Sequence, residues 1–110
     1  MCGSLQARSA NRAALDIAST AMIEAGSIVD RYGELDRVPP LNADLDDAGE
    51  AVRNWRARIE AADAVVVASP EYAGSLAGVV RNALDWIVGS GELYRKPIGL
   101  ICAGDDPGPV

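Results

Sequence analysis

The chain has 110 residues, of which 49% are apolar and 24% are charged. This composition is typical of a globular protein rather than a disordered chain, and the length suits one domain. The net charge of −6 argues against general binding to nucleic acid or anionic membranes, because both depend on positive surface fields. The sequence contains no histidine, which excludes a histidine-based catalytic triad and histidine-ligated metal sites.

The two cysteines, Cys2 and Cys102, lie far apart in the sequence. They could form one disulfide, but nothing marks a secreted disulfide scaffold, so we expect two reduced thiols in a cytoplasmic protein. No apolar run approaches the roughly 20 residues of a membrane span, and the N-terminus shows no signal-peptide pattern. We therefore expect no membrane partner and no nucleic-acid partner.

The first half of the chain contains one clear helical pattern. Apolar residues three and four positions apart predict a helix over residues 9–25, and Gly26 is well placed to end it. Residues 27–30 then predict a short strand, since two β-branched residues lie at its centre. The polar residues 31–47 are too long for a tight turn and predict a connection across the surface.

The second half alternates helices and strands. The spacing of apolar residues predicts a helix over 48–62, with Val52, Trp55 and Ile59 on one face, and another over 76–88. Between them, residues 64–68 form an apolar, β-branched run that is typical of a strand buried on both faces of a parallel sheet. Residues 97–102 predict the next buried strand. This order of elements predicts an α/β layered fold with a doubly wound parallel sheet.

Residues 3–11 form the first candidate site. They combine a glycine, hydroxyl and amide side chains and the start of a helix, a combination that can bind an anion through free N–H groups and the positive end of the helix dipole. The segment lacks the glycine spacing of dinucleotide folds and the Gly-Lys-Ser/Thr of P-loops. The same composition also fits a helix cap that binds no ligand.

Residues 69–75 form the second candidate site, directly after the most buried predicted strand. Pro70 fixes one backbone angle and Gly74 permits unusual ones, so the loop has a defined shape. Its backbone groups could bind a planar heterocycle, with Tyr72 as a flat wall. The alternatives are loop packing for Tyr72, and a solvated acid or a salt bridge for Glu71.

Two other groups of residues have structural interpretations. Trp55 and Trp86 lie at core spacing on predicted helices, which fits core packing or an oligomer contact better than a cofactor wall. Asp44, Asp46 and Asp47 could bind a cation, but they precede a predicted helix and fit a helix N-terminal charge cluster better. We therefore predict no metal site.

Four segments together carry a resemblance to a known family. They are residues 3–11 (GSLQARSAN), 41–45 (LNADL), 69–75 (SPEYAGS) and 81–86 (RNALDW). In this order and spacing they resemble the NADPH-dependent FMN reductase family, which includes quinone, azo-dye and chromate reductases on a flavodoxin-like fold. The resemblance covers nearly the whole chain.

The resemblance implies that residues 1–110 form a partial flavodoxin-like FMN reductase domain. The family's sheet has the strand order 2-1-3-4-5, and the strands predicted here correspond to strands 2, 3 and 4. Residues 1–3 are too short to be the first strand. Because the family's full domain is considerably longer, we expect an incomplete doubly wound sheet that lacks the first and last strands, from a fragment, a mis-started reading frame or a truncated gene copy.

The resemblance also implies a cofactor and its binding residues. FMN is the implied cofactor, with NADPH or NADH as co-substrate. The implied phosphate loop contains Ser4, Gln6, Ser9 and Asn11, and family members commonly have Arg in place of Gln6. The residues implied to line the isoalloxazine ring, mostly through main-chain contacts, are Pro70, Glu71, Tyr72 and Ala73. No catalytic side chain is implied, since the cofactor carries the chemistry.

The implied activity is an NAD(P)H-dependent FMN oxidoreductase. Hydride would pass from NAD(P)H through FMN to a small-molecule acceptor: a quinone, an azo compound, a metal oxyanion or free flavin. The family's flavin commonly lies near a subunit interface, so a homodimer or homotetramer is expected, with the third predicted helix and residues 86–94 as the contact. The alternatives are a non-enzymatic FMN-binding electron carrier and an inactive truncated remnant.

Overall fold

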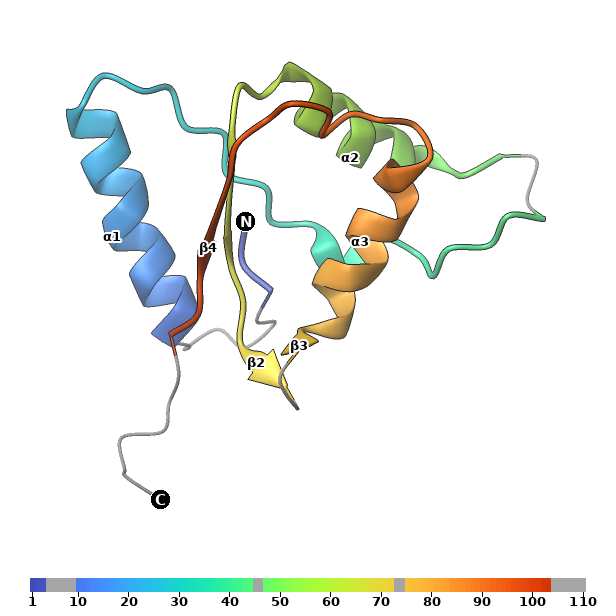
Figure 1. Cartoon of the computed structure of the whole chain (residues 1–110), viewed down its shortest axis with the longest axis horizontal. Coiled ribbons are helices and arrows are strands. Elements are labelled where there is room, and N and C mark those ends of the chain that lie inside the picture. The colour runs from blue at the N-terminus through green and yellow to red at the C-terminus, as the bar shows by residue number, and fades with distance from the viewer. Residues whose placement is uncertain (4–9, 45–46, 73–74, 104–110) are drawn as a thin grey trace.

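The computed structural model describes residues 1–3, 10–44, 47–72 and 75–103. Its elements are α1 (Ala10–Glu24), the 3-10 helix η1 (Leu35–Arg37), α2 (Glu50–Ala61), β1 (Val65–Ala68), β2 (Glu71–Tyr72), β3 (Ser75–Leu76), α3 (Gly78–Val88) and β4 (Ile98–Ile101). β1 and β4 pair in parallel, and α1 lies on one side of this pair while α2 and α3 lie on the other (Figure 1). The predicted α/β layers and the parallel strand pairing are confirmed.

The three long helices agree with the apolar spacing of the sequence. α1 ends two residues before Gly26, whose φ of 99° is a left-handed conformation that glycine adopts without strain. α2 buries the predicted face formed by Val52, Trp55 and Ile59. None of the described helices combines the length and the hydropathy that a membrane span requires.

β1 lies between two neighbours. On one side it pairs with β4, and on the other side it contacts Met1 and Gly3. The N–H of Ala68 donates to the carbonyl of Met1 at 2.9 Å, and the N–H of Gly3 donates to the carbonyl of Ala68 at 2.6 Å. The pairing of Cys2 with Ala68 is an isolated parallel bridge. The most apolar segment of the sequence is therefore the central strand of the described residues.

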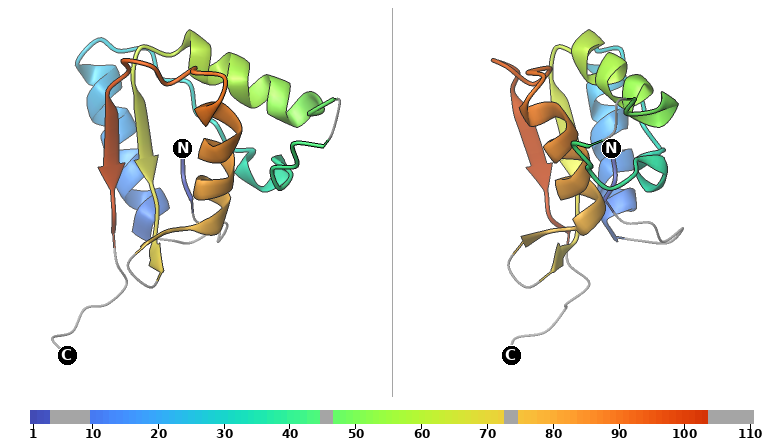
Figure 2. Two further views of the ribbon diagram at one scale, coloured as in Figure 1. Left: turned by 45° about the vertical axis from the view of Figure 1, so that its right-hand side comes forward. Right: turned by 90° about the vertical axis from the view of Figure 1, so that its right-hand side faces the viewer.

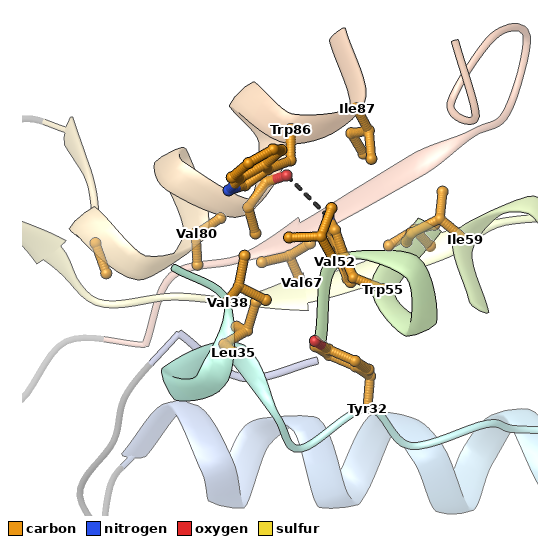
Figure 3. Packing of buried hydrophobic residues seen from close by; sticks show 13 residues of the cluster. Tyr32, Leu35, Val38, Val52, Trp55, Ile59, Val67, Val80, Trp86 and Ile87 are labelled. Carbon is orange, nitrogen blue, oxygen red and sulfur yellow. Dashed lines mark hydrogen bonds between the residues drawn. The ribbon is translucent and has the colours of Figure 1, made fainter. Parts of the chain in front are cut away.

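The main core lies between β1, α2, α3 and η1 (Figure 3). Trp55 is fully buried at its centre, and its indole N–H donates to the carbonyl of Ala83 on α3 at 2.8 Å. The ring of Tyr32 packs against Trp55 with a centroid distance of 4.8 Å. Trp86 is also buried. Both tryptophans are thus core residues, in agreement with the structural interpretation of their spacing.

The predicted strand over residues 27–30 is wrong, because this segment has no regular secondary structure. In the strand order that the resemblance implies, it would pair with the first strand. Here residues 1–3 lie in the place of that first strand, beside β1. Three residues are too few to pair with a second strand along their other edge. Among the described residues no strand lies beside the segment, and Ile28 is 100% exposed.

The prediction that residues 97–102 form a buried strand is half right. The strand forms as β4, but Ile98 and Leu100 remain 52% and 55% exposed. They lie in register with Val65 and Val67, so they share the sheet face that α2 and α3 cover over β1. Within the described part of the chain that cover does not extend over β4. An apolar run indicates a strand, but its burial depends on other elements.

Side chains of α3 hold the long connection between α1 and α2. The indole N–H of Trp86 donates to the carbonyl of Pro39 at 2.6 Å. The carboxamide of Asn82 donates to the same carbonyl at 2.8 Å and accepts the N–H of Leu41 at 3.0 Å. Two residues of the RNALDW segment therefore bind backbone groups that no helix or strand satisfies.

Replacing Asn82 by alanine should lower the free energy of unfolding by about 1–3 kcal/mol, because it removes the hydrogen bonds that its carboxamide makes to the carbonyl of Pro39 and to the N–H of Leu41. Urea unfolding followed by far-UV circular dichroism measures the change. Asp85→Ala is the matched control, since Asp85 is exposed on the same helix, and we expect it to stay within about 0.5 kcal/mol of the unmodified chain. Equal stability of the two variants would show that Asn82 does not hold the connection.

Candidate functional site

The two predicted loops leave the core at the same edge of the sheet. Gly3, which precedes the first loop, donates its N–H to Ala68 at the end of β1. Ser69, which begins the second loop, donates its N–H to the carbonyl of Ile101 at the end of β4, at 2.9 Å. The left view of Figure 2 shows β1 and β4 side by side and pointing the same way, so both strands end at this edge. This edge carries the carboxyl ends of β1 and β4, where ligands bind in open parallel sheets.

Asn11 connects the start of α1 to this edge. Its side chain is buried, with 4% exposed, and its Oδ1 accepts the N–H of Ala103 at 2.9 Å. Ala103 lies just after β4, so the hydrogen bond holds α1 beside the end of that strand. The Asn11 Oδ1 is used in this bond. An anion needs a hydrogen-bond donor, and the amide NH₂ group is the part of the side chain that can donate.

The second loop contains a small antiparallel hairpin. β2 and β3 pair with Glu71 opposite Leu76 and Tyr72 opposite Ser75. Ser69 closes the base of this hairpin, because its Oγ accepts the N–H of Ala77 at 3.2 Å. The sequence predicts a loop of defined shape at this point. The described residues of this loop form two paired strands of two residues each.

The predicted site residues are described to different degrees. Asn11 and Pro70 lie at the edge just described, and Glu71 and Tyr72 make up β2. The predicted site residues outside the described residues are Ser4, Gln6, Ser9 and Ala73. The described flanks of the first loop, Gly3 and the start of α1, both lie at the same sheet edge as the hairpin.

The electrostatics of the edge suit an anion near α1. The first turn of this 15-residue helix contains no acidic residue, and it includes Arg12. The first turn of α3 also lacks acidic residues. Unpaired N–H groups and the helix dipole make such a helix start favourable for negative charge.

The acidic residues before α2 have a different role. Asp47 accepts the N–H of Gly49 at 2.9 Å and forms an ion pair with Arg53. The Gly49 N–H and the charge of Arg53 hold the pKa of Asp47 below its usual range. Asp46 lies outside the described residues. The described residues include no group of three or more side chains that could hold a metal ion, and Asp47 acts at the start of the helix as its sequence position suggests.

The comparison with protein families gives one match that covers nearly the whole chain. The sequence model of the NADPH-dependent FMN reductase family matches residues 1–108. The chain belongs to this family. Its membership confirms the resemblance carried by the four sequence segments, and with it the flavodoxin-like α/β fold.

The chain is also similar in sequence to individual reductases. An NAD(P)H-dependent FMN reductase of Pseudomonas aeruginosa is 40% identical over 86 residues, which are 76% of this chain and 45% of the relative. An NAD(P)H:quinone oxidoreductase of Solanum tuberosum is 37% identical over 109 residues, 94% of this chain and 56% of the relative. An NADPH azoreductase of a Bacillus species is 37% identical over 62 residues, 56% of this chain and 34% of the relative. The chain thus spans about half the length of the first two relatives.

Gly3 and Ser69 lie within the two predicted segments, but sequence reasoning assigned neither of them an individual role. Ser69 is fully buried and bonds to the hairpin base. Gly3 packs so closely that an added Cβ would lie 2.6 Å from Val80 Cγ2 and 2.9 Å from Ser69 Oγ. The order of a glycine before one loop and a hydroxyl after a buried strand was visible, but their contact depends on the tertiary fold.

Proposed function

We propose that this chain binds FMN at the carboxyl edge of β1 and β4 and acts as an NAD(P)H-dependent oxidoreductase. The acceptor would be a quinone, an azo compound, a metal oxyanion or free flavin. Family membership and the names of the quinone and azo reductase relatives support this proposal. The observation that carries it is the meeting of Gly3, Ser69 and Asn11 at one edge, through the hydrogen bonds to Ala68, Ile101 and Ala103.

The start of α1 fits the phosphate end of FMN. Its first turn carries no acidic residue, and the same turn includes the buried carboxamide of Asn11. In the proposal, N–H groups at the helix start and the side chains of the first loop bind the phosphate. The residues assigned to this role are Ser4, Gln6, Ser9 and Asn11.

The hairpin fits the planar ring of FMN. Pairing of β2 with β3 fixes the backbone of the loop, so its N–H and C=O groups can bind polar atoms at the edge of a heterocycle. In the proposal Pro70, Glu71, Tyr72 and Ala73 line the ring. When bound, FMN supplies the transfer of hydride from NADPH or NADH to the acceptor. The protein residues bind and orient the cofactor, so the absence of histidine from the sequence is compatible with the activity.

The remaining parts of the proposal concern assembly and location. Residues 1–110 act as one domain and assemble as a homodimer or homotetramer. The exposed Val88 and Tyr94 support a contact near the end of α3, whereas Trp86 is buried in the core and contributes no side chain to it. A cytoplasmic location is supported by two free cysteines, Cys2 and Cys102, which suit a reducing compartment.

Adding FMN to the purified chain and then NADPH tests the function. Retention of the yellow colour after dialysis, followed by bleaching of the flavin absorbance on anaerobic mixing with NADPH, is the expected result. Retention without bleaching by NADPH or NADH would instead indicate a non-enzymatic electron carrier. A chain that folds and stays colourless would overturn the proposal.

The phosphate loop can be tested with one substitution. Ser9→Ala should raise the Kd for FMN roughly 5- to 30-fold, because it removes one hydroxyl donor, which is worth about 1–2 kcal/mol beside a charged phosphate. Isothermal titration measures the change, and Ser27→Ala, at an exposed position after α1, serves as the control with an unchanged Kd. An unchanged Kd in Ser9→Ala would contradict the assignment of the phosphate to this loop.

A further inference from the structure

The hydroxyl of Ser69 connects the two ends of the hairpin loop. It accepts the N–H of Ala77 at 3.2 Å and donates to the carbonyl of Pro70 at 3.1 Å. The side chain is 0% exposed, so water does not compete for these bonds. One buried oxygen thus binds the residue that enters the hairpin and the residue that leaves it.

The hairpin needs such a connection because it is very short. Each strand has two residues, and the pairing consists of Glu71 with Leu76 and Tyr72 with Ser75. A two-stranded hairpin of this size has little stability of its own. The bond from Ala77 to Ser69 continues the ladder beyond the Glu71–Leu76 pair, with a side-chain oxygen in the place of a backbone carbonyl.

The position of the Ser69 hydroxyl is itself fixed from two directions. The Ser69 N–H donates to the carbonyl of Ile101 at 2.9 Å, which holds its backbone against the end of β4. On the other side lies Gly3, where an added Cβ would lie 2.9 Å from Ser69 Oγ. The residue before the first loop therefore packs directly on the hydroxyl that closes the second loop.

We propose that Ser69 is the positioning residue that holds β2 and β3 together at their base for binding the flavin ring. This inference rests on the proposed function. Ser69 acts through the hairpin and needs no contact with the flavin. Because the pairing of β2 with β3 is held before the ligand arrives, the ordering cost of binding is lower.

Ser69→Ala tests the inference through two ligands. It should raise the Kd for FMN about 10-fold, the effect of losing one buried hydrogen bond. It should raise the Kd for riboflavin by the same factor, because riboflavin has the ring and lacks the phosphate. Ser69→Thr keeps the Oγ but adds a methyl group at a fully buried position, so its Kd values should lie between those of the unmodified chain and Ser69→Ala. Val65→Ala, a buried change at the amino end of β1, should lower stability while both Kd values stay unchanged below its unfolding temperature.

Hydrogen exchange without flavin gives an independent readout. The amide of Ala77 should exchange faster in Ser69→Ala than in the unmodified chain or in Ser69→Thr. If the exchange is equal, or if the unmodified chain binds FMN and Ser69→Ala binds it equally well, the role of Ser69 is overturned while the proposed function stands. If the unmodified chain folds and binds no flavin, the proposed function fails and the flavin role of Ser69 fails with it, whereas the exchange result still reports on the loop.

Discussion

Replacing Trp55 by alanine should lower the free energy of unfolding by about 3–5 kcal/mol. The indole is fully buried between Tyr32 and α3, and its N–H bonds to the carbonyl of Ala83. The substitution removes this packing and the hydrogen bond to the carbonyl of Ala83. Since small domains are stable by only about 5–15 kcal/mol, this loss is a large share of the total stability. Urea unfolding followed by far-UV circular dichroism measures the loss.

Two further variants separate the contributions of packing and hydrogen bonding. Trp55→Phe keeps an aromatic ring and loses the N–H, so its free energy of unfolding should lie between those of the unmodified chain and Trp55→Ala. Ile17→Ala, an exposed apolar change on α1, should stay within about 0.5 kcal/mol. A loss below about 1 kcal/mol in Trp55→Ala would contradict the position of this side chain at the centre of the core.

Gly3→Ala should destabilise the fold by about 1–3 kcal/mol, the usual cost of overpacking. The added methyl would lie 2.6 Å from Val80 Cγ2 and 2.9 Å from Ser69 Oγ, so at least one of these groups must move. Movement of Ser69 would disturb the hairpin, and we therefore expect weaker FMN binding as well. Thermal unfolding and flavin titration measure the two effects.

Gly99→Ala is the matched control, because Gly99 also lies in the sheet but has space for a methyl group. The nearest atom to its added Cβ is Val66 Cγ2 at 3.8 Å, an ordinary contact. We expect it to be neutral or slightly stabilising, by up to about 1 kcal/mol, since alanine restricts the unfolded chain. Equal stability of Gly3→Ala and Gly99→Ala would contradict the close packing of residues 1–3 against β1 and α3.

The sequence predicted the elements whose signal is local. The spacing of Val52, Trp55 and Ile59 specifies one face of α2, and the β-branched run before Ser69 specifies β1. The two errors, the strand at 27–30 and the burial of β4, concern segments whose state depends on neighbours. Their apolar residues fit a sheet interior, but the described residues supply neither a partner strand for the first nor a cover for the second.

The candidate site shows the same division. The resemblance pointed to both loops and to Asn11, and the rule that ligands bind at the carboxyl ends of parallel strands placed them at one edge. The bond from Asn11 to Ala103 and the contact of Gly3 with Ser69 join residues far apart in the sequence. No local pattern encodes such pairs, because they form only when the helices and strands pack.

Amide chemical shifts recorded during a titration with FMN test the central claim most directly. The account predicts that the changes concentrate in residues 3–11, 69–77 and 101–103, at the carboxyl edge of β1 and β4. Asp63 and Lys96, which precede the amino ends of these strands, should stay unchanged. Changes centred on Asp63 and Lys96, or no changes at all in the folded chain, would contradict it.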